Sequence, residues 1–237
     1  MEALQILFED RDILVAVKPV GVESESAKGL EPDMVNMIKK HLSNGNGEPY
    51  VGVVHRLDKP VSGIMVFAKN KESAAALSRQ LREGTMKKKY RAIVCGQPKE
   101  KNGKFSDLLL QDNKTNVTAV VKKGTEGGKL AELNYTLLRK KFLEGEQIAE
   151  VEIELLTGRH HQIRVQFASH GLPLMGDRKY NPAYTRKDEK GRELPPAGLC
   201  GTEMGKQLCL TAVSLAFVHP KSRKALHYEI KPSFTEL

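Results

Sequence analysis

The sequence predicts an α+β fold with a mixed, largely antiparallel central sheet that is flanked by a few helices and loops. Two observations lead to this fold class. Strand-like segments follow one another along most of the chain, and only a few segments have helical periodicity. Residues 148–156 show the strand pattern best, because Val151, Ile153 and Leu155 alternate with glutamates. With 40% hydrophobic and 28% charged residues, the composition is that of a globular protein.

The first third of the chain alternates between short strands and helices. Strands are expected over residues 6–8, 13–17 and 64–68, where apolar residues are concentrated. One helix is expected over residues 34–42. A second is expected over residues 71–83, where Asn70 is a suitable N-cap and Gly84 a suitable end.

The rest of the chain is expected to be mostly strands. They are predicted over residues 88–94, 116–121, 130–138, 148–156, 208–217 and 226–230. The glycine-rich segment from Gly124 to Gly128 is interpreted as a hairpin loop, because strand-like sequence resumes immediately after it. Residues 181–207 are rich in proline, glycine and charge, which predicts a long surface excursion. A single domain over residues 1–237 is therefore expected.

Composition excludes several classes of protein. No run approaches 18 apolar residues, so no membrane-spanning helix is expected. Residues 1–5 lack the basic and apolar segments of a signal peptide. Cys95, Cys200 and Cys209 are widely spaced and form no Cys-x-x-Cys pair, which argues against a disulfide framework and a zinc site. A cytoplasmic protein without a membrane partner is predicted.

The charge of the chain is strongly positive. The formal net charge is +9, and lysine or arginine residues cluster at 87–89, 122–123 and 139–141. A basic protein of this size commonly has a polyanionic partner such as nucleic acid. The alternative is that the lysines only keep the surface soluble.

The most informative segment is His-Arg-Leu-Asp-Lys-Pro-Val-Ser-Gly at residues 55–63. Asp58 follows Arg56 by two positions, Pro60 and Gly63 suggest a turn, and an apolar strand comes next. A buried strand has no need of such a charged segment before it, whereas a reactive carboxylate at a sheet edge does. Taken alone, Asp58 could equally be an ordinary turn aspartate.

Two further segments carry candidate functional residues. In residues 155–165, a strand ends in Thr-Gly-Arg and a helix is expected to begin at His-Gln-Ile-Arg, with Gly158 permitting a tight turn. Arg164 would lie on the first turns of this helix, where it could also be a simple surface arginine. Tyr90 begins the strand after Lys87, Lys88 and Lys89 and could equally be a core tyrosine.

These segments resemble the motifs of the RluA-type family of RNA pseudouridine synthases. The resemblance extends over residues 6–219, and in this family the aspartate at the position of Asp58 is essential. It implies the pseudouridine synthase catalytic-domain fold, with a cleft across the sheet. It also implies that Arg164 pairs with Asp58, that Tyr90 lies against the target base, and that Arg56 enters the space which the base vacates. Residues 18–22, Lys-Pro-Val-Gly-Val, resemble the first motif of the family and are expected to form a turn near the active loop.

The implied reaction converts uridine to pseudouridine in ribosomal or transfer RNA. It is an isomerisation in which no atoms enter or leave, so no cofactor is expected. Asp58 would attack the sugar or the base, or would take a proton from carbon 2 of the ribose, and the sequence leaves these routes open. Contacts with RNA are expected from Arg56, Lys87, Lys88, Lys89, Arg159 and His161.

No metal is expected. The adjacent pair His160-His161 is the one candidate, and neighbouring side chains of a helix do not face the same way. The chain is predicted to be a monomer that consists of the catalytic domain without an upstream accessory domain. Two other functions stay open: an RNA-binding protein without catalysis, and a metal-dependent nuclease or glycosidase, for which a second acidic residue near Asp58 would be needed.

Overall fold

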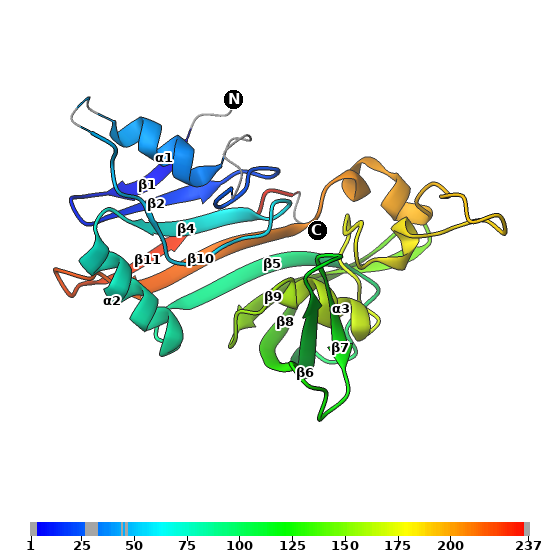
Figure 1. Cartoon of the computed structure of the whole chain (residues 1–237). Coiled ribbons are helices and arrows are strands. Elements are labelled where there is room, and N and C mark those ends of the chain that lie inside the picture. The colour runs from blue at the N-terminus through cyan, green and yellow to red at the C-terminus, as the bar shows by residue number, and fades with distance from the viewer. Residues whose placement is uncertain (1–3, 27–32, 44, 46, 235–237) are drawn as a thin grey trace. The chain divides into compact units, whose positions relative to one another are not determined.

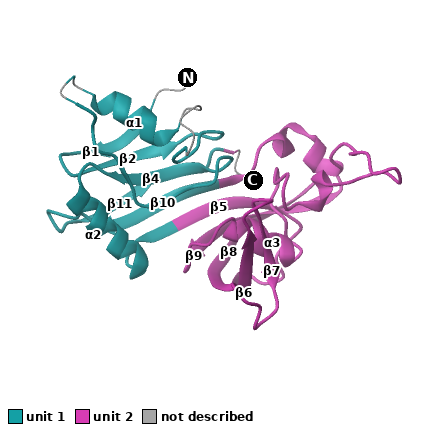
Figure 2. Cartoon of the chain, in the orientation of Figure 1, with its two compact units in different colours: residues 1–88, 211–233 teal, residues 89–210, 234–237 magenta. Residues whose placement is uncertain are grey.

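The chain folds into two compact units. A computed structural model describes residues 4–26, 33–43, 45 and 47–234, so residues 1–3 of the expected non-signal start lie outside the described residues. Unit 1 comprises Met1–Lys88 and Thr211–Ser233, and unit 2 comprises Lys89–Leu210 and Phe234–Leu237 (Figure 2). The single domain over residues 1–237 stays a prediction.

Unit 1 is built on a mostly antiparallel sheet. Its strands are β1 (Gln5–Glu9), β2 (Ile13–Lys18), β3 (Gly52–Val53), β4 (Ser62–Ala68), β10 (Leu210–Val218) and β11 (Ala225–Glu229). Strand β2 lies between β1 and β4, β10 pairs with both β4 and β11, and the short β3 pairs with β4 (Figure 1). The β4–β10 pair is parallel and the other pairs are antiparallel.

Two helices of unit 1 begin at side-chain caps. The first, α1 (Met34–Leu42), begins at Asp33, which accepts a hydrogen bond from the Asn36 N–H at 2.7 Å. The second, α2 (Lys71–Arg82), has the predicted cap, since the Asn70 side chain accepts from the Ser73 N–H at 2.9 Å. Leu77 of α2 packs in a core cluster with the side chains of β2, β4 and β10 that share one face of the sheet. The other face of β4 remains for the loop described below.

Unit 2 contains an antiparallel sheet in the order β5-β9-β8-β6-β7. Its strands are β5 (Lys87–Cys95), β6 (Asn102–Asp112), β7 (Val117–Val121), β8 (Lys129–Leu143) and β9 (Glu146–Leu155). Helix α3 (Gln162–Ser169) packs on this sheet, with Val165 in a cluster with Leu109 and Ala131. The Phe167 and Phe105 rings meet edge to face, with centroids 5.0 Å apart. This sheet fixes the position of α3 within unit 2.

The largest error of the sequence-based assignment concerns β6, which it did not predict. Strand β6 pairs with β7 on one side and with β8 on the other. The segment from Gly124 to Gly128 therefore connects two strands that are not neighbours, and its interpretation as a hairpin loop was wrong. Only Phe105 and Leu109 of β6 are buried, and its apolar residues do not alternate with polar ones in the pattern of a half-buried strand, so the sequence does not mark it as one.

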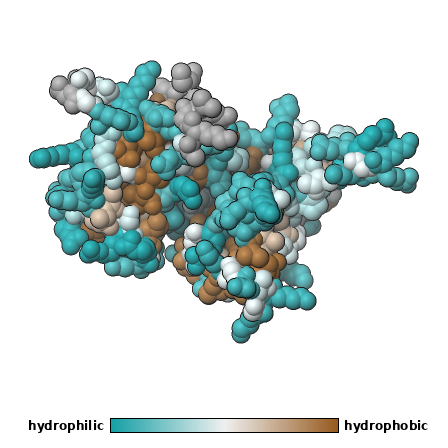
Figure 3. Space-filling model, in the orientation of Figure 1, coloured by the Kyte–Doolittle hydropathy of each residue, from teal (hydrophilic) through white to brown (hydrophobic). Residues whose placement is uncertain are grey.

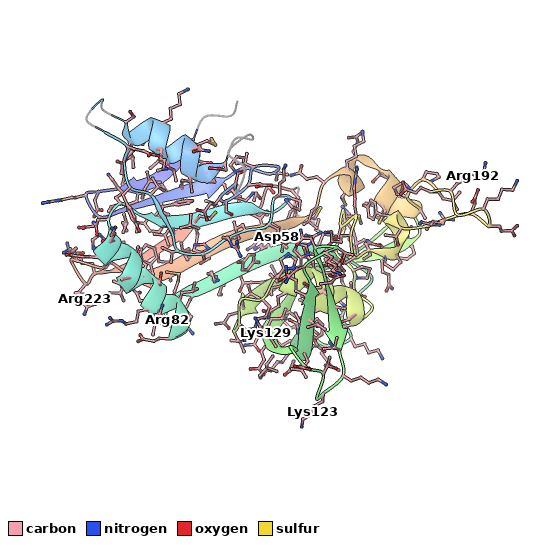
Figure 4. All side chains as sticks on the ribbon, viewed as in Figure 1. Asp58, Arg82, Lys123, Lys129, Arg192 and Arg223 are labelled. Atoms are coloured by element: carbon pink, nitrogen blue, oxygen red, sulfur yellow. The ribbon has the colours of Figure 1, made fainter. Side chains whose placement is uncertain are left out.

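The predicted excursion over residues 181–207 is only partly at the surface. It contains three short 3₁₀ helices, η1 (Pro182–Tyr184), η2 (Gly198–Gly201) and η3 (Glu203–Lys206). Arg192 extends outward at its far end (Figure 4). Leu199 and Cys200 are buried in a cluster with Ile93 and Met175, so η2 contributes to the core of unit 2.

The surface of the described residues carries some exposed apolar side chains. Figure 3 shows apolar areas on the face in view, one of them over the β6–β8 region. The large exposed apolar side chains of the described residues include Val120, Leu130 and Phe142. Within the described part of the chain, no helix is both long enough and apolar enough to cross a membrane.

Candidate active site

Asp58 lies in the loop that joins β3 to β4 in unit 1. Its side chain is half-buried, whereas Arg56 is exposed and Leu57 between them is buried (Asp58 is labelled in Figure 4). The Val61 N–H donates to the Asp58 carbonyl at 2.9 Å, which closes a turn around Lys59 and Pro60. Leu57 fixes the loop to the core and leaves the charged residues on either side of it accessible.

Hydrogen bonds hold the backbone on both sides of Asp58. The Ser24 hydroxyl donates to the Leu57 carbonyl at 2.8 Å and accepts from the Leu57 N–H at 3.0 Å. The Lys59 carbonyl accepts from the Gly21 N–H at 2.9 Å and from the Lys18 ammonium at 3.2 Å. The turn of residues 18–22 therefore packs against the Asp58 loop, as the sequence predicted, and the backbone around the carboxylate is restrained on both sides.

Lys18 is a fully buried lysine beneath this loop. Its ammonium donates to the carbonyls of Pro19 at 2.9 Å and Val22 at 2.6 Å, in addition to that of Lys59. Burial lowers the pKa of Lys18 to about 8, and the carboxylates of Asp58 and Glu23 act in the opposite direction. Lys18 is consequently a cation at neutral pH, and it lies close enough to Asp58 for the two charges to interact. The sequence motif located this turn but gave no indication that the lysine charge lies inside it.

Gly63 and His55 fix the strand that follows the loop. A Cβ atom on Gly63 would lie 2.4 Å from the Ala212 carbonyl oxygen of β10, so only glycine fits this crossing. His55 is buried, and its Nε2 accepts from the Val66 N–H at 3.4 Å. Burial, with the charge of Lys88 as a smaller cause, lowers the pKa of His55 to about 3. His55 is therefore neutral and serves as a packing and hydrogen-bonding residue.

The turn before α3 in unit 2 is tied together by Gln162. Its Oε1 accepts from the Thr157 hydroxyl at 2.8 Å and from the Arg159 N–H at 2.9 Å, and its Nε2 donates to the Glu132 carbonyl at 3.0 Å. The helix begins at Gln162, one residue after the predicted start at His161. The left-handed backbone conformation in this turn lies at His161, with φ of 52°.

Arg164 of α3 is buried against Asp177. Its Nε and Nη2 atoms donate to the two carboxylate oxygens of Asp177, each at 2.8 Å, in a bidentate ion pair. The Arg164 Cζ atom also lies 5.2 Å from the centroid of the Tyr180 ring. Arg164 is thus an interior residue held in one orientation, and the interpretation as a surface arginine is wrong. The sequence gave no sign of the partner Asp177.

The remaining predicted residues have different environments. Tyr90 lies on β5 and has 5% of its surface exposed. Lys87 is exposed, Lys88 is half-buried, and Lys89 forms an exposed ion pair with Glu152. Lys87 and Lys88 belong to unit 1, as Asp58 does. Tyr90 and Lys89 belong to unit 2, as Arg164 does.

Arg159 and His161, both predicted to contact RNA, differ in exposure. Arg159 is exposed, and its Nε donates to the Leu130 carbonyl at 2.9 Å. His161 is buried, and its Nδ1 lies 2.6 Å from the Tyr180 hydroxyl. Because His161 adopts a left-handed conformation, its ring stacks on that of His160 at 3.6 Å, contrary to the expectation that the two rings face apart.

Among the described residues, one group could hold a metal by proximity: Asp10, Asp12 and His219. Its ligand atoms are already hydrogen-bonded. The Nδ1 of His219 accepts from the backbone N–H groups of Lys221 and Ser222, so the proton lies on Nε2, which donates to Asp10 at 2.8 Å. The other Asp10 oxygen accepts from the Asp12 N–H at 2.8 Å. The group is a hydrogen-bonded corner of unit 1 and does not resemble a metal centre.

Comparison with known proteins assigns the chain to a class of RNA-modifying enzymes. The sequence profile of the RNA pseudouridylate synthase family matches residues 12–169. The chain belongs to this family and is an RNA pseudouridine synthase, an isomerase, which confirms the RluA-type resemblance.

The relatives and structural neighbours cover most of the chain. It is 34% identical over 230 residues to the uncharacterized RNA pseudouridine synthase YlyB of Bacillus subtilis (strain 168), covering 95% of this chain and 68% of the relative. It is 33% identical over 231 residues to the ribosomal large subunit pseudouridine synthase D of Zymomonas mobilis, with the same coverage of 95% and 68%.

Two solved human proteins share the fold. Human RNA Pseudouridylate Synthase Domain Containing 4 has a TM-score of 0.73 at 24% identity, covering 96% of this chain and 88% of that one. Human RNA Pseudouridylate Synthase Domain Containing 1 has a TM-score of 0.71 at 22% identity, covering 96% and 83%. The predicted α+β fold with a largely antiparallel sheet is thereby confirmed.

Proposed function

We propose that the protein isomerises specific uridines in large-subunit ribosomal RNA, with Asp58 as the catalytic carboxylate. The observation that carries this proposal is the restrained loop around Asp58. Hydrogen bonds from Ser24 and Lys18 hold the backbone on both sides of a half-buried carboxylate. A group that attacks a sugar or base, or removes a ribose proton, needs a fixed position and an ionised form. The Asp58 carboxylate interacts with the Lys18 ammonium, whose pKa it raises against the effect of burial.

Arg164 and Tyr90 complete the proposed site. A guanidinium in contact with Asp58 would keep the carboxylate ionised and orient it through directed hydrogen bonds. Tyr90 would supply a ring face for the uracil and a phenol for removing the proton from carbon 5. The buried environments of both side chains in unit 2 support roles that depend on a fixed orientation.

Arg56 is proposed to help the target uridine leave its stack. Extruding a base from folded RNA requires a few kcal/mol. A planar cation can occupy the vacated space and also meet phosphate, and Arg56 is exposed two residues before Asp58 in the same loop. Lys87, Lys89 and Arg159 are exposed cations that could contact the RNA backbone without reading its sequence.

Ribosomal RNA is favoured as the substrate by the names of the relatives. Several of them are ribosomal large subunit pseudouridine synthases, including those of Zymomonas mobilis and Neisseria meningitidis. We therefore propose action on ribosomal RNA in the cytoplasm, with transfer RNA as the alternative substrate. Mapping pseudouridine in total RNA from cells with and without the gene decides between them. Loss of signal at transfer RNA positions alone would overturn the ribosomal assignment.

The catalytic role of Asp58 is tested by tritium release from RNA that carries tritium at carbon 5 of uracil. We expect Asp58→Asn to lower the release rate on the order of 10³-fold or more while RNA binding persists. The matched control is Asp112→Asn, the same substitution at the exposed end of β6 in unit 2. Release by Asp58→Asn at the control rate would rule out Asp58 as the catalytic carboxylate, whereas no release by the native protein would favour an RNA-binding protein without catalysis.

A further inference from the structure

Asp177 is a buried acidic residue to which the proposed reaction gives no direct role. Its side chain is 1% exposed and its two oxygens accept the Nε and Nη2 donors of Arg164, each at 2.8 Å. One of these oxygens also accepts from the backbone N–H groups of Lys179 at 2.9 Å and Tyr180 at 3.2 Å. The carboxylate thus links the α3 arginine to the loop of residues 177–180.

The same loop restrains the arginine from a second direction. Tyr180 places its ring 5.2 Å from the Arg164 Cζ atom. The Tyr180 hydroxyl in turn accepts from the Thr118 N–H at 2.9 Å and lies 2.6 Å from the His161 Nδ1 atom. His161 precedes α3 in a left-handed conformation, which directs its ring to this hydroxyl. The tyrosine is therefore fixed at both its ring and its hydroxyl, and the guanidinium has little freedom to turn.

The charges suggest why such a partner is needed. An interior guanidinium is always ionised and requires an anion close to it. If Arg164 served Asp58 alone, it would lose its counter-ion whenever the Asp58 carboxylate formed a bond or took up a proton. A second carboxylate that takes no part in the chemistry keeps the arginine neutralised throughout. It also engages the Nε–Nη2 edge and so fixes the direction in which the Nη1 end points.

We propose that Asp177 is a positioning residue for the isomerisation, which holds the Arg164 guanidinium in the orientation that the catalytic carboxylate requires. This inference rests on the proposed role of Arg164 in the active site. Asp177 itself touches no substrate. Its effect on the reaction passes through Arg164, and the aromatic ring of Tyr180 reinforces the same orientation.

A double-mutant cycle on kcat tests this role. The full chain is prepared as the native sequence, Asp177→Asn, Arg164→Met and the double variant, with tritium release measured at saturating and limiting RNA. We expect Asp177→Asn to lower kcat about 10–100-fold with little change in KM. We expect the double variant to have the kcat of Arg164→Met, because a residue that acts through Arg164 has nothing to act on without it.

Two comparisons separate positioning from a loss of folded protein. Circular dichroism and the stoichiometry of RNA binding give the folded fraction of each variant, and kcat is calculated per folded molecule. Asp177→Glu keeps the charge and moves the carboxylate by one methylene, so it should remain folded even if Asp177→Asn does not. We expect it, too, to lower kcat at least about 10-fold.

The outcomes distinguish this inference from the proposed function. Native kcat per folded molecule in Asp177→Glu, or effects of Asp177→Asn and Arg164→Met that multiply in the double variant, would overturn the positioning role. Full activity of Arg164→Met would instead remove Arg164 from the site, and full activity of Asp58→Asn would overturn the catalytic carboxylate. If Asp58→Asn is inactive while the Asp177 variants keep native kcat, only the positioning role fails.

Discussion

Replacing Lys18 by methionine gives the sharpest test of the buried cation beneath the Asp58 loop. Methionine preserves the length and most of the volume of the side chain but removes the ammonium. The carbonyls of Pro19 and Val22 then lose a charged donor, whereas the Lys59 carbonyl retains the Gly21 N–H. Each lost bond destabilises the folded state by about 1–3 kcal/mol. This effect alone would lower the free energy of unfolding by about 2–6 kcal/mol.

The removal of the buried charge acts in the opposite direction. The difference between a pKa of 10.5 and one of about 8 corresponds to a penalty of about 3 kcal/mol for keeping Lys18 charged in the folded state. The methionine variant escapes this penalty. At pH 7 the two effects largely cancel, so the variant is expected to differ from the native protein by less than about 3 kcal/mol. The change at a single pH is therefore a poor test, and the pH dependence is the informative measurement.

The sign of that dependence follows from the lowered pKa. Below about pH 8 both folded and unfolded states carry the proton, and the penalty is fully present. As the pH rises from about 8 towards 10.5, the folded state loses its proton first and becomes relatively more stable. Between pH 7 and pH 9.5 the native protein should gain about 2 kcal/mol relative to Lys18→Met.

Urea unfolding of both proteins at the two pH values measures this gain, because other titrating groups contribute equally to both. Lys40→Met, at an exposed position of α1, serves as the control and should show no such gain. A constant difference between the native protein and Lys18→Met from pH 7 to pH 9.5 would refute the assignment of a depressed pKa to Lys18. It would also show that burial does not bring the Lys18 ammonium close to losing its proton near neutral pH.

Three further predictions concern other parts of the structure. Gly63→Ala should lower the melting temperature far more than Gly21→Ala, because a Cβ at position 63 would lie 2.4 Å from a backbone oxygen whereas one at position 21 would have open space. Equal shifts of the melting temperature in the two variants would contradict this. The sulfurs of Cys95 and Cys200 lie 3.9 Å apart, so oxidation by diamide should join these two residues in a disulfide that peptide mass mapping detects. A disulfide from either residue to another thiol would argue against the packing of η2. Arg56→Ala should lower the isomerisation rate about tenfold or more on folded RNA but much less on an unstructured oligonucleotide, and equal losses on both would exclude a role in opening the RNA.

Local signals explain which elements could be predicted. Helix α2 was recognised with its cap and its end because Asn70 and Gly84 act on adjacent backbone groups, independently of the rest of the fold. The same holds for α1, whose predicted bounds match the observed ones. The start of α3 was also predicted to within one residue, whereas the left-handed conformation of His161 was not predicted. The His161 ring meets the hydroxyl of the distant Tyr180, a contact that a local pattern cannot reveal.

Long-range pairing explains what could not be predicted. Strand β6 exposes polar residues along much of its length. Its extended conformation is stabilised by pairing with β7 and β8, which lie next to it in the sheet, and its own sequence does not indicate this pairing. In the same way, Ser24 is separated from Leu57 by 33 residues, and nothing in the sequence around it marks it as an anchor of the Asp58 loop. The motif identified the proposed catalytic carboxylate, whereas the residues that hold its loop are distributed through the unit.

The two basic residues that are buried near the proposed chemistry are stabilised in different ways, and this difference bears on their roles. Lys18 is surrounded by backbone carbonyls, and burial lowers its pKa to about 8, so its charge depends on its immediate surroundings. Arg164 has a permanent charge and a dedicated carboxylate in Asp177. A cation that must keep one orientation through a reaction benefits from a fixed bidentate partner, whereas a cation that anchors a loop needs only acceptors. On this reasoning, Lys18 variants should chiefly alter the stability of the loop and its pH dependence, and Asp177 variants should chiefly alter kcat.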